Sequence, residues 1–354
     1  MLSAGLYFYF KEKFSKKICL NEEKVMDYYG TIGPACANHE MLVRMYENGM
    51  TGIRLNLSHG MLMEHTDWLE MASKAADSVG KKTKILIDLQ GPELRVGVLK
   101  SECVLTDGSE VILGDEAIPI PKILFDHCKC GMHLLLDDGK IKAEILACDT
   151  DQMIVKILRG GILRSRKSIA VCDVQIPSPT LTKQDIENLK VAKQYGVTGV
   201  MLPFVRHTGD LMELKKVLKE NDAEHIQIFA KIENMQGVEA LESFMALADE
   251  IIIARGDLGN AMPLWELPRV QKSVSNICQK ADKPFMVVTQ MLDSMEHRPV
   301  PTRAEVSDIY NAVLDGASSV MLTGETAIGD YPAEAMLYLV NTAQEALKYK
   351  TEDK

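Results

Sequence analysis

Short runs of apolar residues alternate along this chain with longer stretches in which apolar positions recur at helical spacing. The short runs have the length and the β-branched content of buried strands, and the longer stretches have the period of amphipathic helices. We count eight such rounds. The predicted strands are Tyr28–Ile32, Gly52–Leu57, Lys84–Leu89, Gly199–Phe204, Ile226–Ile232, Glu250–Ala254, Phe285–Thr289 and Ser319–Leu322.

A helix is predicted in every round. Thr182 and Thr302 stand where an N-cap is expected, and Gly196 and Gly316 follow helices where a left-handed residue is favoured. Eight β/α rounds favour an α/β fold, a closed (β/α)8 TIM barrel. A doubly wound open sheet is the alternative, but no glycine-rich fingerprint follows the first strand. The predicted helices are Asn38–Asn48, Leu62–Val79, Lys183–Tyr195, Gly209–Lys219, Gly237–Leu247, Pro263–Lys280, Arg303–Leu314 and Pro332–Tyr349.

The regular alternation is interrupted once, after the third strand. There the runs Val104–Leu113, Leu134–Ile145 and Met153–Leu158 look like strands separated by Asp-Gly, Gly-Asp and Gly-Gly turns. An insertion in a βα loop lies at the barrel end where chemistry is done, so a small all-β lid is expected, with a rigid decoration as the alternative. We therefore predict a barrel from residues 26–95 and 173–354, a lid from residues 96–172, and an N-terminal extension, residues 1–25, outside the fold.

Composition narrows the class of protein. The net charge is −10, which gives no electrostatic reason to expect nucleic acid or an anionic membrane as partner. No stretch reaches the roughly 18 apolar residues of a membrane-spanning helix. Eight cysteines are scattered without a disulfide rhythm, and no export signal is evident, so a cytoplasmic protein with reduced thiols is expected.

One cluster of possible metal ligands lies inside the insertion. His127, Cys128, Cys130 and His133 stand close together in the sequence. A lone Cys-x-Cys lacks the second pair that a closed tetrahedral zinc site uses. We do not expect zinc there.

Polar residues follow the apolar strands at almost every predicted strand end. In a parallel barrel these ends converge on one mouth. Six polar ends in register are hard to explain as solvation and indicate an active site. These residues are Arg54, Asn56, Ser58 and His59; Asp88, Glu93 and Arg95; Lys231 and Glu233; Arg255, Gly256 and Asp257; Thr289 and Gln290; and Thr323, Glu325 and Thr326.

The residue types at this mouth point to chemistry on a phosphate group. Glu233 and Asp257 offer two carboxylates, a set that suits Mg²⁺ better than Ca²⁺. Arg54 and Lys231 supply positive charge for an anionic substrate. Gly256 lets backbone N–H groups approach a ligand closely. The oxygens of Asn56, Ser58 and Asp88 would suit a monovalent cation, and a lid over such a mouth favours phosphoryl transfer, because water must be excluded.

Several of these segments resemble the pyruvate kinase family. Few of these segments would be specific alone. They follow one another in the same order as in the family, from about residue 30 to residue 348, and this order and their spacing make the resemblance specific. The segments that carry the resemblance are Thr31–Ala35, Arg54–Gly60, Gly91–Arg95, Ala230–Asn234, Ala254–Gly259, Thr289–Leu292, Pro301–Glu305 and Gly324–Ala327.

The resemblance implies the glycolytic transfer of phosphate from phosphoenolpyruvate to ADP, with pyruvate and ATP as products. It implies Mg²⁺, or Mn²⁺, at Glu233 and Asp257. It implies K⁺ at Asn56, Ser58, Asp88 and the carbonyl of Leu89. The substrate is expected at Arg54, Lys231, Gly256, Asp257 and Thr289, with Lys231 stabilising the charge of the phosphoryl group and the enolate. Thr289, through water and Glu325, is expected to relay a proton, and the nucleotide is expected at Asn56, His59, Arg95 and Lys167.

Some positions depart from the family pattern. Glu93 stands where family members with a carboxylate usually need K⁺, so K⁺ dependence is expected. Leu89 and Gln90 replace the usual threonine and lysine, which removes a positive charge near the mouth. A second reading is therefore a catalytically weak remnant with a binding role, and a third is a Mg²⁺-dependent lyase or aldolase acting on pyruvate-type enolates.

The family normally continues into a C-terminal α/β domain that carries an allosteric site, whereas this sequence ends at Lys354. Control through that domain is therefore expected to be absent. A homodimer through the barrel is expected, which light scattering would test.

Overall fold

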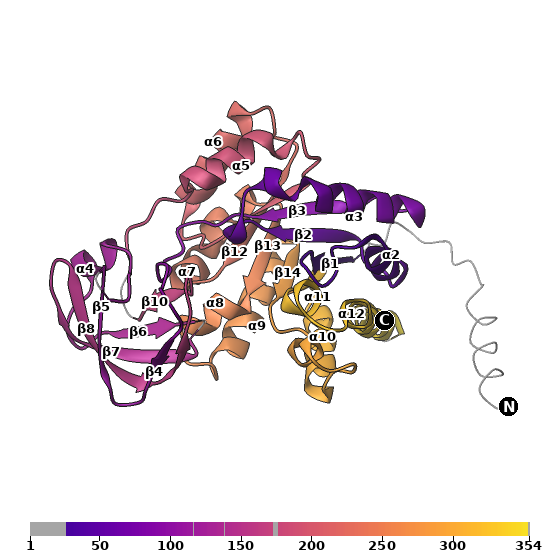
Figure 1. Cartoon of the computed structure of the whole chain (residues 1–354). Helices are drawn as coiled ribbons and strands as arrows, with labels where there is room; N and C mark the ends of the chain where they lie inside the picture. The colour runs from indigo at the N-terminus through magenta and orange to yellow at the C-terminus, as the bar shows by residue number, and fades with distance from the viewer. Residues whose placement is uncertain (1–25, 116, 138, 173–175, 353–354) are drawn as a thin grey trace.

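The computed structural model describes residues 26–115, 117–137, 139–172 and 176–352. The prediction for residues 1–25 and the predicted barrel–lid boundary at residue 173 lie outside the described residues. Within them, eight parallel strands form a closed barrel in the order β1-β15-β14-β13-β12-β11-β3-β2 (Figure 1). The predicted closed barrel is confirmed, and the open sheet is wrong.

The barrel strands lie close to their predicted positions, with ends that differ by at most two residues. Most residues of each strand are buried, because helices cover the outside of the barrel and side chains fill its interior. They are β1 (Asp27–Thr31), β2 (Gly52–Asn56), β3 (Lys84–Asp88), β11 (Gly199–Leu202), β12 (Gln227–Ile232), β13 (Glu250–Ala254), β14 (Phe285–Val288) and β15 (Ser319–Leu322).

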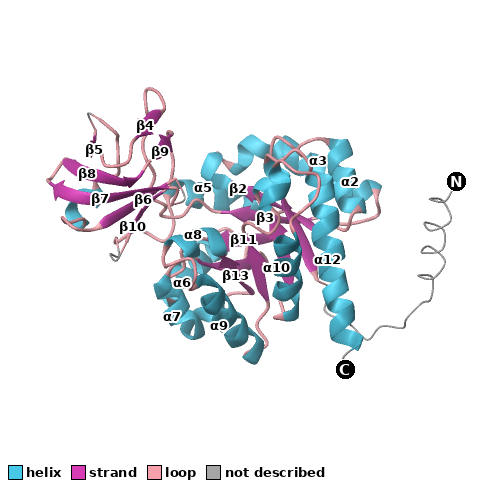
Figure 2. Cartoon of the chain, turned by 90° about the horizontal axis from the view of Figure 1, so that it is seen from below, coloured by secondary structure: helices cyan, strands magenta, loops and turns pink. Residues whose placement is uncertain are grey.

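Helices surround these strands, as Figure 2 shows. Thr182 and Thr302 both cap their helices, as predicted, and each also forms a capping box. The helix predicted from Pro263 begins only at Leu267, with Pro268 in its first turn, where proline is tolerated. The helices are α2 (His39–Glu47), α3 (Thr66–Ser78), α5 (Lys183–Ala192), α6 (Thr208–Glu220), α7 (Met235–Phe244), α8 (Arg255–Asn260), α9 (Leu267–Lys280), α10 (Arg303–Leu314), α11 (Gly324–Ala327) and α12 (Pro332–Glu352), with 3-10 turns at Leu57–His59, Leu62–His65, Met245–Leu247 and Asp293–Glu296.

The segment between β3 and α5 forms β structure beside the barrel (Figure 1). It contains a five-stranded sheet in the order β10-β6-β7-β8-β5 and a two-stranded sheet of β4 and β9. It also has its own hydrophobic cluster, which includes Leu134, Val155 and Leu163. The elements are β4 (Cys103–Leu105), β5 (Glu110–Gly114), α4 (Ile123–His127), β6 (His133–Leu136), β7 (Ile141–Cys148), β8 (Gln152–Arg159), β9 (Gly161–Leu163) and β10 (Ile169–Val171).

Two of the three predicted runs in this segment are each divided into two strands. Gly108 divides the first run and Gly139 the second, and both glycines have a positive φ. Turns with this backbone conformation favour glycine. The second run is therefore a hairpin of β6 and β7, whereas the two strands of the first run enter different sheets, with β4 paired to β9 and β5 to β8. The short elements α4, β9 and β10 were not predicted.

A small hydrophobic cluster fills the interior of the barrel. It includes Tyr29, Phe229, Met286 and Met321, all buried. This packing closes the middle of the barrel, as in other barrels of this class. Polar groups are therefore confined to its two ends.

At the end of the barrel where the strands begin, Glu250 is buried at the start of β13. Its Oε1 accepts hydrogen bonds from the hydroxyls of Ser319 at 2.6 Å and Ser318 at 2.9 Å. Burial raises the pKa of Glu250 to about 7, against the opposing effect of the serine hydroxyls and with a further increase from Asp27. The carboxyl group is therefore protonated in the folded protein at a pH where it would ionise in the unfolded chain.

This raised pKa predicts a pH-dependent stability. Such a group stabilises the fold below its unfolded pKa of 4.5, and that contribution is lost as the pH rises towards 7. Glu250→Gln keeps an acceptor for the serines but cannot ionise. Between pH 4.5 and pH 8 the wild type should lose about 3 kcal/mol of unfolding free energy that Glu250→Gln does not lose. Urea unfolding at both pH values measures this, with the exposed Glu70→Gln as control. An equal pH dependence in wild type and Glu250→Gln would contradict it.

Candidate active site

Lys231, on β12, lies at the centre of the barrel mouth between two carboxylates. Its Nζ is 2.9 Å from Oε1 of Glu233 and 3.1 Å from Oδ2 of Asp88. All three residues are buried. Burial alone would lower the pKa of Lys231, but the charges of Asp88 and Glu233 outweigh this effect and raise the pKa above its usual value. The ammonium group is therefore held as a permanent cation at a fixed place.

Arg54, on β2, brings a second cation to the same carboxylate. Its Nη2 lies 2.6 Å and its Nε 3.2 Å from Oδ2 of Asp88, and its Nη1 donates to the hydroxyl of Thr31 at 3.3 Å. Burial would raise the pKa of Asp88, but Lys231 and Arg54 hold it below its usual value. Two cations thus share Asp88, and because Glu233 also pairs with Lys231, the four side chains carry no net charge. The two cations nevertheless stand at fixed positions where an anionic ligand can meet them.

Glu233 follows β12 and is fixed from its other side. Its Oε2 accepts the backbone N–H of Phe204 at 2.8 Å. Phe204 has a φ of 52°, which is uncommon for a residue with a bulky side chain. This contact between the ends of β11 and β12 was not predicted, because nothing in the sequence marks Phe204 as left-handed.

Glu233 and Asp257 are suited to a hard divalent cation. The strands that precede them, β12 and β13, are hydrogen-bonded neighbours, with Ile232 opposite Ile253. Asp257 lies in the first turn of α8. Among the described residues no three His, Cys, Asp or Glu side chains gather as a metal site. An ion held by these two carboxylates would take its other ligands from water and substrate, as Mg²⁺ commonly does.

The four residues expected at K⁺ lie at the ends of two paired strands. Asn56 and Asp88 are register partners of β2 and β3. The side-chain oxygen of Asn56 accepts the backbone N–H of Ser58 at 3.2 Å, and Leu89 follows Asp88 directly. These oxygen donors fit a monovalent cation, although Asp88 also neutralises Arg54 and Lys231, which the sequence did not indicate.

Thr289 and Gln290 form a strained turn at the end of β14. Their φ angles are 77° and 53°. A Cβ added at Gly256 would lie 3.1 Å from Cγ2 of Thr289, so the glycine lets the two segments approach closely. The sequence placed Thr289 at the mouth but gave no sign of this backbone conformation.

Glu325 follows β15, is buried, and holds two loops together through hydrogen bonds to their backbones. One oxygen accepts the backbone N–H of Leu292 at 3.0 Å, and the other accepts that of Thr323 at 2.7 Å. These contacts give Glu325 a positioning role for the segment after Thr289. Its participation in proton relay stays a prediction.

Of the residues expected to meet nucleotide, Arg95 lines a hollow beside the mouth, whereas Asn56, His59 and Lys167 are not among the described residues that line it. Arg95 is held by Glu93, with Nη2 and Oε2 2.6 Å apart, and its Nη1 donates to the carbonyl of Arg166 at 2.7 Å. Lys167 forms an ion pair of 2.7 Å with Asp137. His59 lies in the turn after β2, and its side chain is outside the described structure. The hollow has a volume of about 520 Å³ and is lined by Ser58, Gly60, Met61, Glu64, Gln90, Arg95, Arg166 and Gln184.

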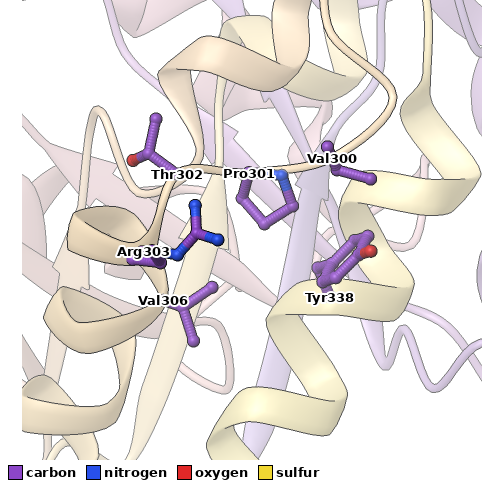
Figure 3. A pocket seen from close by; sticks show the side chains of 6 residues that line it. All are labelled: Val300, Pro301, Thr302, Arg303, Val306 and Tyr338. Carbon is purple, nitrogen blue, oxygen red and sulfur yellow. The ribbon is translucent and has the colours of Figure 1, made fainter.

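A second hollow, of about 380 Å³, lies between the start of α10 and α12 (Figure 3). None of the predicted site residues lines it. Its lining residues are Val300, Pro301, Thr302, Arg303, Val306 and Tyr338.

Two further residues at the mouth were not assigned a role from sequence. Asp185, in α5, accepts the backbone N–H groups of Gln90 at 2.8 Å and Gly91 at 3.1 Å, and so fixes the segment that leads to Arg95. Arg255, at the start of α8, contacts the Thr289 turn. Arg255 stood among the polar strand ends, whereas Asp185 carried no sequence signal beyond its place in a capping box.

No helix among the described residues has the length and apolar character needed to cross a membrane.

Comparison with known proteins agrees with this geometry. The family model "Pyruvate kinase, barrel domain" matches residues 24–336. The pyruvate kinase of Bacillus licheniformis is 38% identical over 334 residues, which cover 90% of this chain and 57% of the relative. That of Geobacillus stearothermophilus is 38% identical over 86% of this chain and 54% of the relative, and that of Clostridium acetobutylicum is 36% identical over 89% and 69%. The chain thus spans little more than half the length of the first two relatives. On this evidence, the chain belongs to the pyruvate kinase family.

Proposed function

We propose that this chain transfers the phosphoryl group of phosphoenolpyruvate to ADP, which yields pyruvate and ATP. The observation that carries the proposal is the buried cluster of Arg54, Asp88, Lys231 and Glu233 at the barrel mouth. Two cations are held there beside two carboxylates, and a hollow lined by Arg95 lies close by. Charge stabilisation of a transferring phosphoryl group needs this combination.

Each residue of the mouth has a separate role in the proposed reaction. Arg54 and Lys231 bind the phosphate, and Lys231 also faces the negative charge that develops on the enolate oxygen. The backbone at Gly256 and Asp257 contacts the substrate, because glycine permits close approach. Mg²⁺, held by Glu233 and Asp257, would neutralise charge on the phosphoryl oxygens. The hydroxyl of Thr289, supported by Glu325, delivers a proton to the enolate.

The nucleotide is received on the side of the inserted β domain. Asn56, His59, Arg95 and Lys167 are its proposed contacts, and Arg95 and Lys167 would have to exchange their present carboxylate partners for phosphate. The insertion acts as a lid that excludes water, so that phosphate passes to ADP rather than to solvent. A cytoplasmic homodimer formed through the barrel is part of the same proposal.

A coupled assay tests the proposal. The purified chain is incubated with phosphoenolpyruvate, ADP, Mg²⁺ and K⁺, and ATP and pyruvate are measured separately. Equal amounts of both products support the proposal. Pyruvate without ATP would indicate hydrolysis or lyase chemistry. The absence of both products would favour the catalytically weak remnant.

K⁺ dependence is expected because Glu93 adds a negative charge near Glu233 and Lys231. Burial raises the pKa of Glu93, with Arg95 opposing and Glu233 adding to the shift. Replacing K⁺ by tetramethylammonium should lower ATP formation by about 100-fold, because one fixed positive charge is lost from the site. Full activity in tetramethylammonium would contradict this. Glu93→Lys is the matched control, since it adds a fixed charge and should reduce the dependence.

A further inference from the structure

Two consecutive residues at the end of β14 are held in the left-handed region. Thr289 and Gln290 have φ angles of 77° and 53°. A β-branched residue such as threonine rarely adopts this conformation, and such strain persists only where surrounding contacts enforce it. The structure must therefore contain a group that holds this turn.

Arg255 is that group. Its Nε and Nη2 donate to the carbonyl of Thr289 at 3.1 Å and 2.6 Å, and Nη2 also donates to the carbonyl of Gln290 at 3.1 Å. Its Nη1 forms an ion pair of 2.5 Å with Asp308 on α10. The Arg255 side chain is only 11% exposed, whereas that of Asp308 is 34% exposed.

The position of Arg255 in the chain links this turn to the proposed phosphate and metal site. Arg255 begins α8 and directly precedes Gly256 and Asp257. One side chain thereby ties the end of β13 to the end of β14. The planar fork of Arg255 reaches the two carbonyls and the carboxylate through three separate nitrogens, a spread of donors that the single nitrogen of a lysine does not match.

We propose that Arg255 is a positioning residue that fixes the Thr289 hydroxyl against Gly256 and Asp257 for delivery of the proton to the enolate. This inference rests on the proposed function. We call the contacts of Arg255 with the carbonyls of Thr289 and Gln290 the Arg255 clamp. A displacement of a reacting group by about 1 Å is sufficient to slow a reaction by roughly 100-fold, so loss of the clamp should have a measurable effect on kcat.

The test compares Arg255→Lys with the wild type and with Arg269→Lys, a control at an exposed arginine on α9. Arg255→Lys should lower kcat about 10- to 100-fold, with less than about a threefold change in KM for phosphoenolpyruvate. Exchange of solvent deuterium into the methyl group of pyruvate reports the proton step in reverse, and it should fall by at least the same factor. The control should match the wild type in all three measurements.

Two further variants separate the clamp from a general structural role. Asp308→Asn leaves the carbonyl contacts in place and should reduce kcat less than Arg255→Lys does. Gln290→Gly removes part of the strain, because glycine adopts positive φ freely, so adding it to Arg255→Lys should recover part of the lost exchange.

The outcomes distinguish this inference from the proposed function. An inactive wild type contradicts the proposed function itself. An active wild type together with unchanged kcat in Arg255→Lys overturns the positioning role. A lowered kcat with normal deuterium exchange, or no recovery in the double variant, also overturns it. If Arg255→Lys does not fold, Arg255→Lys combined with Gln290→Gly is measured, and failure of that variant to fold would show that Arg255 serves the fold rather than Thr289.

Discussion

Lys231→Met is expected to lower kcat for ATP formation by about 1,000-fold or more, a loss of about 4 kcal/mol of transition-state stabilisation. Methionine keeps most of the length and volume of the side chain but removes its charge. The ammonium group of Lys231 lies 2.9 Å from Glu233 and 3.1 Å from Asp88, so its position is already fixed before any substrate binds. A preorganised charge is worth more than a mobile one, because no rearrangement is needed during the reaction.

The same substitution should also destabilise the fold. It leaves Glu233 without its cation, and removing one partner of a buried ion pair costs about 3 kcal/mol or more. The coupled assay and urea unfolding are therefore measured on the same preparation, below the unfolding transition. Lys74→Met, at an exposed ion pair with Glu70, is the control and should leave both quantities nearly unchanged. A folded Lys231→Met variant with more than a tenth of wild-type kcat would show that Lys231 is not central.

The barrel could be predicted from sequence because each of its strands is buried on both faces. Such strands read as continuous apolar runs, and Phe285–Val288 and residues 251–254 are clear examples. The ends of these strands could also be predicted, because polar residues at the ends of several buried strands indicate a functional site. That is how Lys231 and Glu233 were found, and the structure places them 2.9 Å apart.

The insertion was harder to predict. Many of its strand residues are exposed, and two of its strands, β4 and β9, have only three residues each. A strand of that length has no periodicity of its own. It forms because a neighbouring strand pairs with it, as Val104 does with Ile162, and such long-range pairing is not visible in a local pattern.

The contacts among the residues of the site could not be predicted from the sequence either. The left-handed conformations of Phe204, Thr289 and Gln290 contradict local propensity, so only the folded chain reveals them. Asp88 was expected to contact a monovalent cation, and the structure shows in addition that it holds Arg54 and Lys231. Sequence indicates which groups reach the mouth, whereas the pairing among them depends on side-chain geometry.

Glu233→Gln is expected to weaken Mn²⁺ binding by about 100-fold and to lower kcat by about 1,000-fold. The amide carbonyl of glutamine can still accept the N–H of Phe204, so the loop after β11 should keep its place. What is lost is one of only two proposed carboxylate ligands. Mn²⁺ binding measured by electron paramagnetic resonance, without substrate, reports the site independently of activity, and a single site per chain is expected.

Glu93→Gln is the matched control for the metal site. The Glu93 side chain is only 15% exposed, and Glu233 lies close enough to raise the pKa of Glu93. Glu93 nevertheless pairs with Arg95 and is not a proposed Mg²⁺ ligand. It should leave Mn²⁺ affinity within a few-fold of the wild type. Asp257→Asn should instead reproduce the loss seen in Glu233→Gln, because both carboxylates would hold the same ion. Should Glu233→Gln and Asp257→Asn both bind Mn²⁺ normally, these two residues do not share a metal, and the positive charge that phosphoryl transfer needs would then have to come from Arg54 and Lys231 alone.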